Sequence, residues 1–255
     1  MTVIQSLARA LQMLDLFDEN TKSLSIKEIS TRLHLNKSTA HSLLKTLKLY
    51  GYISQDEMTQ EYALGWKLYE RGNMVINQID LKNIAARHLK VLNMQTNETV
   101  HLVIRLDNEA FYLDKINGHN TLVIYSKIGK KVPLHSSAVG KVLTAYLKEE
   151  KIKRIFENYE FTRATPQTIT DYEAFIEELQ IVREQGFAMD KEENELGIIC
   201  MAMPLRDYSG EVIASVSVST PKINYSKRKA QDIEKYLKHC VEEISKELGY
   251  NPISY

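Results

Sequence analysis

The stretch NKSTAHSLLKTLKLYGY, residues 36–52, decides the fold of the first part of the chain. Its apolar residues recur at the spacing of one helical face, and they are Ala40, Leu43, Leu44 and Leu47. Asn36 is a residue type that begins helices, and Gly51 is one that ends them. We therefore predict a helix from residue 37 to about residue 50 that buries its apolar side.

The opposite side of this predicted helix carries short hydrogen-bonding residues, and no acid occurs between Lys37 and Tyr50. A solvent-facing helix usually carries longer charged side chains, whereas short ones allow a helix to enter the major groove of DNA. Lysines are suited to phosphates, while histidine and serine can reach base edges. We therefore predict a DNA-recognition helix whose contacts are Lys37, Ser38, Thr39, His41, Ser42 and Lys45. For Ser38 and Thr39, helix capping is an alternative role.

The flanking sequence completes a recognisable unit. Leu7, Leu11, Leu14 and Phe17 recur at helical spacing and predict a first helix that ends near residue 19 or 20. Residues 25–28, SIKE, form a capping box that begins a second helix. Residues 52–53 and 62–64 are typical of two short strands joined by a polar turn. Helix, turn, helix and hairpin in this order predict a winged helix-turn-helix.

The net charge of the chain is zero, which by itself argues against a nucleic-acid partner. The charge is unevenly distributed, however. Residues 20–50 carry a net charge of +5 from one acid, Glu28, and six bases, Lys22, Lys27, Arg32, Lys37, Lys45 and Lys48. Such a patch suffices for phosphate contacts. On charge alone, a solvated helical surface is the favoured explanation.

Composition bounds the class of protein. With 255 residues, 44% of them hydrophobic and 26% charged, the chain has the composition of an ordinary globular protein. No apolar run approaches the roughly 20 residues needed to cross a bilayer, and Asp15 and Asp18 interrupt the apolar stretch where a signal peptide would lie. We expect a cytoplasmic protein without a membrane partner.

From residue 65 onward, helical and strand periods alternate. We predict helices over 65–79, 81–94, 136–147, 149–158, 170–185 and 226–248, and strands over 99–106, 111–113, 122–125, 187–189, 198–205 and 211–219. Thr170 with Glu173 resembles a capping box. Hairpins dominate, so we expect an α+β domain with a mainly antiparallel sheet flanked by helices.

Two features of this second region suggest a ligand. Residues 136–140, SSAVG, open a helix with small side chains, and free backbone N–H groups at such an opening favour an anion. Close packing against the sheet would require the same small residues. Ser215, Ser217 and Ser219 share one face of a predicted strand, although a solvent-facing side would explain them without a ligand.

The sequence motifs that could indicate a catalytic site or a metal site are weak. Gly140-Lys141 lacks the earlier glycine of a P-loop and is followed by Val142. Cys200 lies in a buried-strand pattern, which makes a thiol inert and argues against an enzyme with His101 or His135. The acidic run of Glu192, Glu193 and Glu195 is typical of a solvated loop. We expect no catalytic residue, no cofactor and no metal.

Several motifs in order resemble the IclR-type bacterial transcriptional regulators. The match runs from about residue 5 to residue 245. Its blocks are KSTxHxLLxTLxxxGY from Lys37, YxLG from Tyr62, GxxxPLHxSAxGK from Gly129, TIT from Thr168, RxxGFAxD from Arg183, ExxxGIxCxAxP from Glu193 and SVSVS from Ser215. The resemblance implies a winged helix-turn-helix in residues 1–66, a linker helix in 67–80 and a GAF/profilin-like sensor domain in 81–255. It also implies a homodimer or tetramer that binds double-stranded operator DNA.

The resemblance further implies which residues hold a small-molecule effector, namely Ala138, Val139, Asp190, Ile198, Cys200, Ser217 and Ser219. Where many members carry arginine in the recognition helix, this chain has Ser42, so the operator of a relative does not transfer to it. We expect a ligand-responsive repressor of a metabolic operon that senses a small carboxylate. The alternative is a metabolite-binding domain or metabolic enzyme with an incidental helical head.

Overall fold

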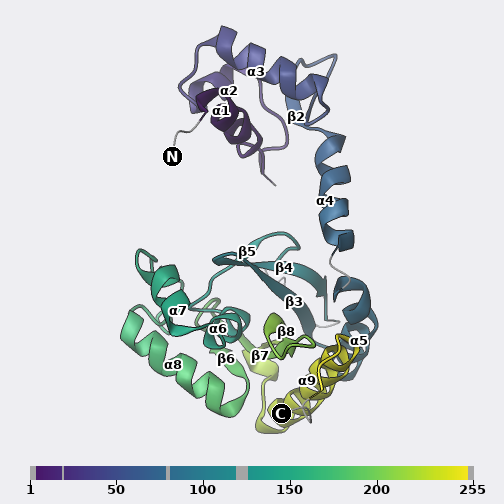
Figure 1. Cartoon of the computed structure of the whole chain (residues 1–255), viewed down its shortest axis with the longest axis vertical. Helices are drawn as coiled ribbons and strands as arrows, with labels where there is room; N and C mark the ends of the chain where they lie inside the picture. The colour runs from purple at the N-terminus through teal and green to yellow at the C-terminus, as the bar shows by residue number, and fades with distance from the viewer. Residues whose placement is uncertain (1–3, 19, 79–80, 119–125, 252–255) are drawn as a thin grey trace. The chain divides into compact units, whose positions relative to one another are not determined.

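A computed structural model describes residues 4–18, 20–78, 81–118 and 126–251 (Figure 1). The chain divides into two compact units, Met1–Asp80 and Leu81–Tyr255. No helix among the described residues is long and apolar enough to cross a membrane.

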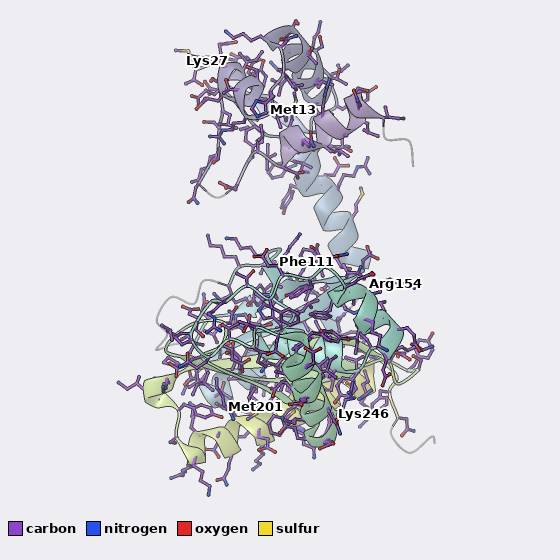
Figure 2. The ribbon with its side chains drawn as sticks, turned by 90° about the vertical axis from the view of Figure 1, so that its left-hand side faces the viewer. Met13, Lys27, Phe111, Arg154, Met201 and Lys246 are labelled. Carbon is purple, nitrogen blue, oxygen red and sulfur yellow. The ribbon has the colours of Figure 1, made fainter. Side chains whose placement is uncertain are left out.

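The first unit is a small helical domain with a hairpin. Its elements are α1 (Gln5–Leu14), α2 (Ile26–Arg32), α3 (Lys37–Leu49), β1 (Ile53–Gln55), β2 (Tyr62–Leu64) and α4 (Trp66–Gln78). The strands β1 and β2 pair antiparallel, as a wing does. Met13, Ile29 and Leu44 are fully buried in its core. Figure 2 shows Met13 enclosed by the helices of this unit and Lys27 at its edge.

Local interactions explain why these elements begin and end where they do. The Ser25 hydroxyl accepts from the Glu28 amide, and the Glu28 carboxylate accepts from the Ser25 amide, so the predicted capping box is confirmed. Asn36 is the N-cap of α3, but its side chain makes no capping hydrogen bond. A Cβ on Gly65 would lie 2.1 Å from the Gly51 carbonyl oxygen. Glycine at position 65 therefore allows the start of α4 to approach the end of α3.

The second unit is built around one six-stranded antiparallel sheet in the order β5-β4-β3-β8-β7-β6. Its strands are β3 (Thr99–Leu106), β4 (Glu109–Ile116), β5 (Lys131–Val132), β6 (Ala188–Lys191), β7 (Ile198–Arg206) and β8 (Val212–Pro221). Its helices are α5 (Leu81–Thr96), α6 (Ala138–Ala145), α7 (Glu149–Phe156), α8 (Tyr172–Gln185), the short 3-10 helix η1 (Lys222–Asn224) and α9 (Lys227–Glu247). The predicted α+β architecture is confirmed.

Helices cover both faces of this sheet. The helices α5 and α9 pack together on one face, and α6, α7 and α8 lie on the other (Figure 1). As a consequence, β8 is buried on both sides over Ala214–Pro221. Ser215, Ser217 and Ser219 are at most 3% exposed, so a solvent-facing interpretation of these serines is wrong.

Several predicted boundaries differ from the structure. The first helix ends at Leu14 rather than near residue 19 or 20, and Phe17 reaches the core from the turn that follows. The N-cap of α8 is Asp171 rather than Thr170, because the Asp171 carboxylate accepts from the Ala174 amide. The two-residue strand β5 was not predicted. The predicted strand over 122–125 lies outside the described residues.

Candidate functional site

The predicted DNA contacts lie together on the outer side of α3. Lys37, Ser38, His41, Ser42 and Lys45 are exposed, and Thr39 is half-buried, whereas Ala40 and Leu44 on the inner side are fully buried. The Ser42 hydroxyl donates to the Ser38 carbonyl oxygen at 3.0 Å. That hydroxyl oxygen therefore remains an acceptor on the outer side of the helix.

The hairpin beside α3 has the opposite charge. All six basic side chains between residues 20 and 50 are exposed. The wing sequence from Ile53 to Leu64, in contrast, contains Asp56, Glu57 and Glu61 and neither lysine nor arginine. Asp56 accepts from the amides of Met58 and Thr59, which lowers its pKa and keeps it ionised. The helices, rather than the wing, thus carry the charge that suits phosphate.

In the second unit, one cavity of about 30 Å³ lies between α6 and the sheet. Its lining residues are His101, Tyr112, Ser137, Ala138, Val139, Asp190, Asn194, Glu195, Ile198, Cys200, Ser217 and Ser219. All seven residues predicted to bind an effector are among them. Ser137 belongs to the helix start over residues 136–140 that the sequence had suggested as a ligand site. His101, Tyr112, Asn194 and Glu195 were missed because their place at the cavity depends on strand register and on a loop, neither of which a linear motif records.

The start of α6 supplies the polar backbone of this cavity. The Ser137 hydroxyl accepts from the Gly140 amide at 3.0 Å and caps the helix. The first intrahelical hydrogen bond of α6 runs from the backbone amide of Lys141 to the Ser137 carbonyl. The amides of Ala138 and Val139 come before it and have no partner within the helix. Such amides at a helix start carry partial positive charge. A Cβ on Gly140 would lie 2.3 Å from the Pro133 carbonyl oxygen, so glycine allows this start to pack closely.

A histidine on β3 lies against the serine row of β8. Nδ1 of His101 is 3.4 Å from the hydroxyls of both Ser217 and Ser219, and Nε2 is 2.7 Å from the Ser126 hydroxyl. Burial lowers the pKa of His101 to about 3, so the imidazole is neutral at physiological pH. Its ring centroid lies 5.0 Å from that of Tyr112. This wall therefore offers neutral hydrogen-bonding groups.

Asp190 and Cys200 form a third wall from the paired strands β6 and β7. Oδ1 of Asp190 accepts from the amides of Glu193 at 2.7 Å and Asn194 at 3.3 Å. Burial nevertheless raises the pKa of Asp190 to about 7. Burial, together with the neighbouring Asp190, also raises the pKa of the Cys200 thiol. A thiol with a raised pKa is a poor nucleophile.

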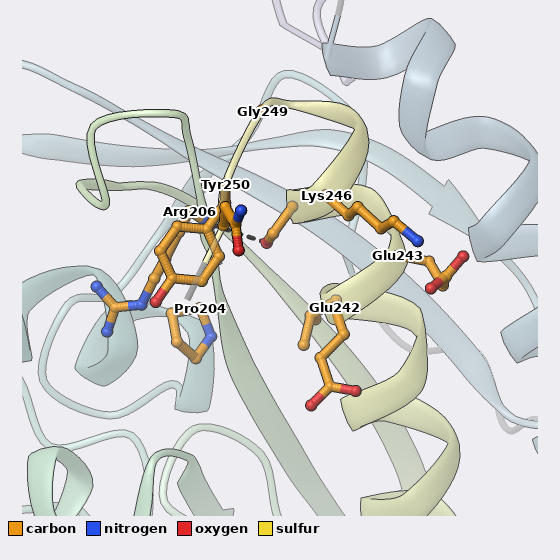
Figure 3. Close-up of a pocket in the computed structure, with 10 residues that line it drawn as sticks. Pro204, Arg206, Glu242, Glu243, Lys246, Gly249 and Tyr250 are labelled. Atoms are coloured by element: carbon orange, nitrogen blue, oxygen red, sulfur yellow. Dashed lines mark hydrogen bonds between the residues drawn. The ribbon is translucent and has the colours of Figure 1, made fainter. Parts of the chain in front are cut away.

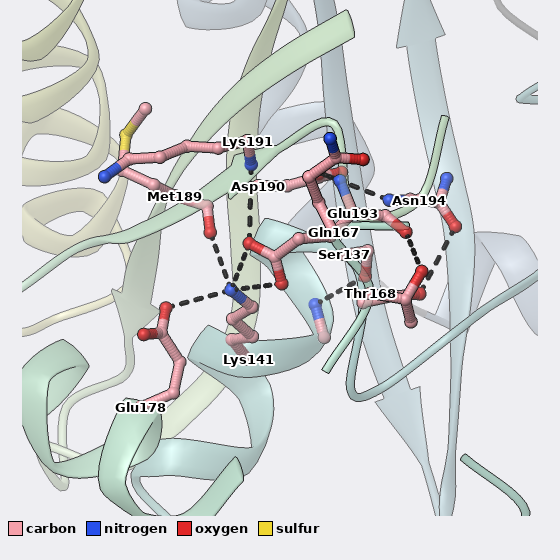
Figure 4. A network of polar contacts seen from close by, with 12 residues as sticks. Ser137, Lys141, Gln167, Thr168, Glu178, Met189, Asp190, Lys191, Glu193 and Asn194 are labelled. Carbon is pink, nitrogen blue, oxygen red and sulfur yellow. Dashed lines mark hydrogen bonds and ion pairs between the residues drawn. The ribbon is translucent and has the colours of Figure 1, made fainter. Parts of the chain in front are cut away.

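A buried lysine lies behind this wall (Figure 4). Lys141 is 0% exposed, and its Nζ lies 2.8 Å from Oε1 and 2.7 Å from Oε2 of Glu193. It also donates to Glu178 and to the Met189 carbonyl, both at 2.9 Å. The interpretation of residues 192–195 as a solvated loop is therefore wrong for Glu193, which is 8% exposed and paired.

Larger grooves occur elsewhere in the second unit. One of about 640 Å³ lies between the end of β7 and the end of α9, and its lining includes Arg206, Glu242, Lys246 and Tyr250 (Figure 3). Another of about 430 Å³ is lined by His135, Ser136 and Tyr159 among others. Neither contains a predicted effector residue.

A winged helix-turn-helix followed by a helix-flanked sheet with a small polar cavity defines the class of DNA-binding transcriptional regulators. The family models of the IclR helix-turn-helix domain and of the IclR C-terminal domain match residues 6–57 and 73–246. The chain belongs to the IclR family. It is therefore a transcriptional regulator and not an enzyme.

Individual relatives agree with this assignment. The regulator XynR of Escherichia coli (strain K12) is 42% identical, with 98% of this chain and 99% of that protein covered. KdgR of the same organism is 37% identical over 90% and 88% of the two chains. Among solved structures, the IclR protein of Thermotoga maritima has a TM-score of 0.80 at 33% identity and covers 97% of this chain and 100% of that one.

Proposed function

We propose that this regulator is a repressor of a metabolic operon and that a small carboxylate bound in the α6 cavity changes its affinity for DNA. The observation that carries the proposal is the convergence of three groups on one cavity. These are the free amides at the start of α6, the Ser217 and Ser219 hydroxyls, and the Asp190 carboxyl.

The polarity of these groups supports a carboxylate. The amides of Ala138 and Val139 would bind its oxygens, because a helix start favours an anion. Ser217, Ser219 and Asp190 would bond to hydroxyl or carbonyl groups elsewhere on the ligand. An IclR homolog of the same fold from Microbacterium hydrocarbonoxydans was solved in complex with 4-hydroxybenzoate, a carboxylate, with a TM-score of 0.82 at 24% identity. Relatives named as repressors, such as YiaJ of Escherichia coli at 33% identity, support repression.

The outer side of α3 is the proposed operator-reading surface. Lys37 and Lys45 would bind phosphates, while His41 and Ser42 would contact base edges, with Ser38 and Thr39 beside them. All of these side chains except half-buried Thr39 are exposed. Because Ser42 replaces a longer residue, its contact requires closer approach of the helix to the bases.

Self-association would place two such helices on a pseudo-palindromic site. Exposed apolar side chains support a homodimer or tetramer: Ile4, Leu7 and Leu11 on or beside α1, and Trp66 and Tyr69 on α4 are all more than half exposed. In this proposal, residues 1–66 bind DNA, residues 67–80 link the parts, and residues 81–255 sense the effector. The effector would shift the population between states that differ in DNA affinity.

A thermal-shift screen of small keto acids, sugar acids and aromatic acids on the full chain tests the cavity. We expect an acid that stabilises the wild type but not Ser217→Ala or Asp190→Ala. Ser215→Ala is the matched control, because Ser215 is equally buried on the same strand but donates to the Met203 carbonyl and lies outside the cavity lining. Equal stabilisation of all variants would refute this site.

A further inference from the structure

The α6 cavity is too small to hold an effector without a change in its walls. Its volume of about 30 Å³ equals roughly the share of one water molecule in the liquid. Small-molecule sites usually measure about 300–1,000 Å³. If the proposed function is correct, part of the cavity wall must therefore move when a ligand enters.

Most of the wall is held firmly. His101, Ser217 and Ser219 lie on β3 and β8, which are interior strands of the sheet, and every residue of α6 is buried. Tyr112 lies on β4 and is held from both sides. It pairs with Val103 of β3 on one side, and its amide donates to the Lys130 carbonyl on the other. The backbone of these parts of the lining is held in place by the sheet and the core.

Asp190, Ile198 and Cys200 of the lining lie on the paired strands β6 and β7, and the rest of this side of the lining comes from the loop that joins the two strands, residues 192–197. Asn194 and Glu195 of this loop line the cavity and are half-buried, and Leu196 beside them is 60% exposed. This loop is thus the section of the wall that has solvent on its other side.

Glu193 supplies the buried attachments of the loop. At its two ends the loop is also held by Thr165, whose hydroxyl donates to the Glu192 carbonyl at 2.6 Å, and by Lys222, whose amide donates to the Gly197 carbonyl at 2.7 Å. The Glu193 carboxylate is paired with buried Lys141, its amide donates to Asp190 at 2.7 Å, and its carbonyl accepts from the Thr168 hydroxyl at 2.6 Å. Figure 4 shows these attachments converging on Glu193 from α6, from β6 and from the segment before α8.

We propose that residues 192–197 are the gate of the effector cavity and that Lys141 is a positioning residue that holds the gate closed through Glu193. Lys141 does not touch the cavity itself, since it lies behind the lining. Its Nζ fixes the Glu193 side chain, and the Glu193 amide in turn orients Asp190. The lysine therefore sets both the position of the gate and the direction of a cavity carboxyl.

Cys200 makes the gate measurable without an effector. Its thiol lines the cavity, and the only other cysteine of the chain, Cys240, is buried on α9 at the opposite face of the sheet. Cys200 is half-buried, so the wild-type labelling rate with methyl methanethiosulfonate is the baseline, and opening of the wall should raise this rate. Mass spectrometry of the full-length protein after timed labelling gives separate rates for the two cysteines.

We expect Glu193→Gln and Thr168→Val to speed the labelling of Cys200 by about tenfold or more. The first removes the charge that pairs with Lys141, and the second removes the hydroxyl that donates to the Glu193 carbonyl. Glu178→Gln is the matched control. It neutralises another carboxylate partner of the same Lys141 ammonium group, but Glu178 lies on α8 and not on the gate, so the rate should stay within about twofold of wild type. Lys141→Met should act like Glu193→Gln, and Lys141→Arg should partly restore the wild-type rate.

Three results would overturn the gate: no acceleration in Glu193→Gln and Thr168→Val, equal acceleration in Glu178→Gln, or parallel acceleration at Cys240, which would mean that the whole unit opens. If Lys141→Met does not fold, the other variants still decide. The labelling requires no ligand, so failure of the carboxylate screen and failure of the gate are separate results.

Discussion

His101 and Asp190 line the same cavity, and their pKa values shift in opposite directions. Burial lowers the pKa of His101 from 6.5 to about 3 and raises that of Asp190 from 3.8 to about 7. Both side chains are therefore neutral in the folded protein at mildly acidic pH. In the unfolded chain at the same pH, both would be largely charged, because their pKa values return to the ordinary range.

These two shifts predict opposite effects of pH on stability. Between about pH 4 and 7, folded Asp190 binds a proton that the unfolded chain releases, so its contribution to the free energy of unfolding is lost as pH rises. Between about pH 3 and 6.5, His101 is protonated in the unfolded chain but not in the folded protein. The contribution of His101 to the free energy of unfolding is therefore lost as pH falls. In the wild type the two slopes should largely cancel between about pH 4.5 and 6.5.

Replacing one of the two residues should leave the pH dependence that the other gives to the free energy of unfolding. We expect Asp190→Asn to become more stable, and His101→Asn less stable, as pH rises from about 4.5 to 6.5, by up to ~1.4 kcal/mol per pH unit. Urea unfolding at several pH values measures this. Parallel curves for the two variants and the wild type would contradict the assignment of these shifts.

The two N-caps of the helix-turn-helix differ in a way that predicts unequal costs. Ser25→Ala removes a reciprocal capping box and should destabilise the first unit by about 1 kcal/mol. Asn36→Ala should cost less than about 0.5 kcal/mol, because the Asn36 side chain makes no capping bond. Hydrogen exchange of peptides from α2 and α3 measures both changes. A larger cost at Asn36 would show that this side chain caps α3 in solution.

Two helical glycines should respond oppositely to alanine. Gly140→Ala places a Cβ 2.3 Å from the Pro133 carbonyl oxygen and 2.6 Å from Leu134 Cα, and both are backbone atoms. It should therefore destabilise the second unit by roughly 1–3 kcal/mol. A Cβ at position 72 would meet nothing within 4 Å, so Gly72→Ala should stabilise α4 by about 0.5–1 kcal/mol. Unfolding midpoints in urea distinguish the two, and a gain at position 140 would contradict the close approach.

Lys45 should contribute to DNA affinity through phosphate. Lys45→Gln is expected to weaken binding to operator and competitor DNA alike. It should reduce the slope of log K against log salt by about 0.9, as expected for one lost phosphate contact. Lys151→Gln on α7 is the control, since that lysine is equally exposed but lies in the other unit. An unchanged slope in Lys45→Gln would place its ammonium group away from phosphate.

The acidic wing should weaken DNA binding by repulsion. Glu57 is exposed at the turn of the hairpin, and the turn itself is held by Asp56 rather than by Glu57. Glu57→Lys should therefore raise affinity for all duplex sequences and steepen the salt dependence without altering the fold. Fluorescence anisotropy with operator and random duplexes measures both effects. Unaltered binding to both would mean that the wing lies away from the DNA.

Much of the architecture could be predicted from local patterns. The helical period of α3, the capping box at Ser25 and the hairpins of the second unit depend on neighbouring residues, which a sequence displays directly. The end of α1 was misplaced because Phe17 continues the helical spacing, yet reaches the core from a turn. Periodicity records which side of the chain is buried, but it does not record whether the backbone is still helical.

The parts of the candidate site that were missed depend on residues far apart in the chain. His101 meets Ser217 through the register of β3 and β8, across 116 positions. Lys141 meets Glu193 across 52 positions, and each looks like an ordinary surface residue in its own segment. The serines of β8 likewise suggested a solvent face, because no local pattern shows that α6 covers them.

The alternation along β8 has a consequence for how such regulators diverge. Ser215, Ser217 and Ser219 face the α6 side of the sheet, and Ala214, Val216 and Val218 face the opposite side. Neighbouring residues of β8 therefore pack against different layers. Exchange of Ser217 or Ser219 for alanine, cysteine or threonine should alter the polarity of the cavity wall and leave the packing on the other face untouched. Under the proposed function, single small substitutions on this face would change which ligand is bound while the scaffold stays the same.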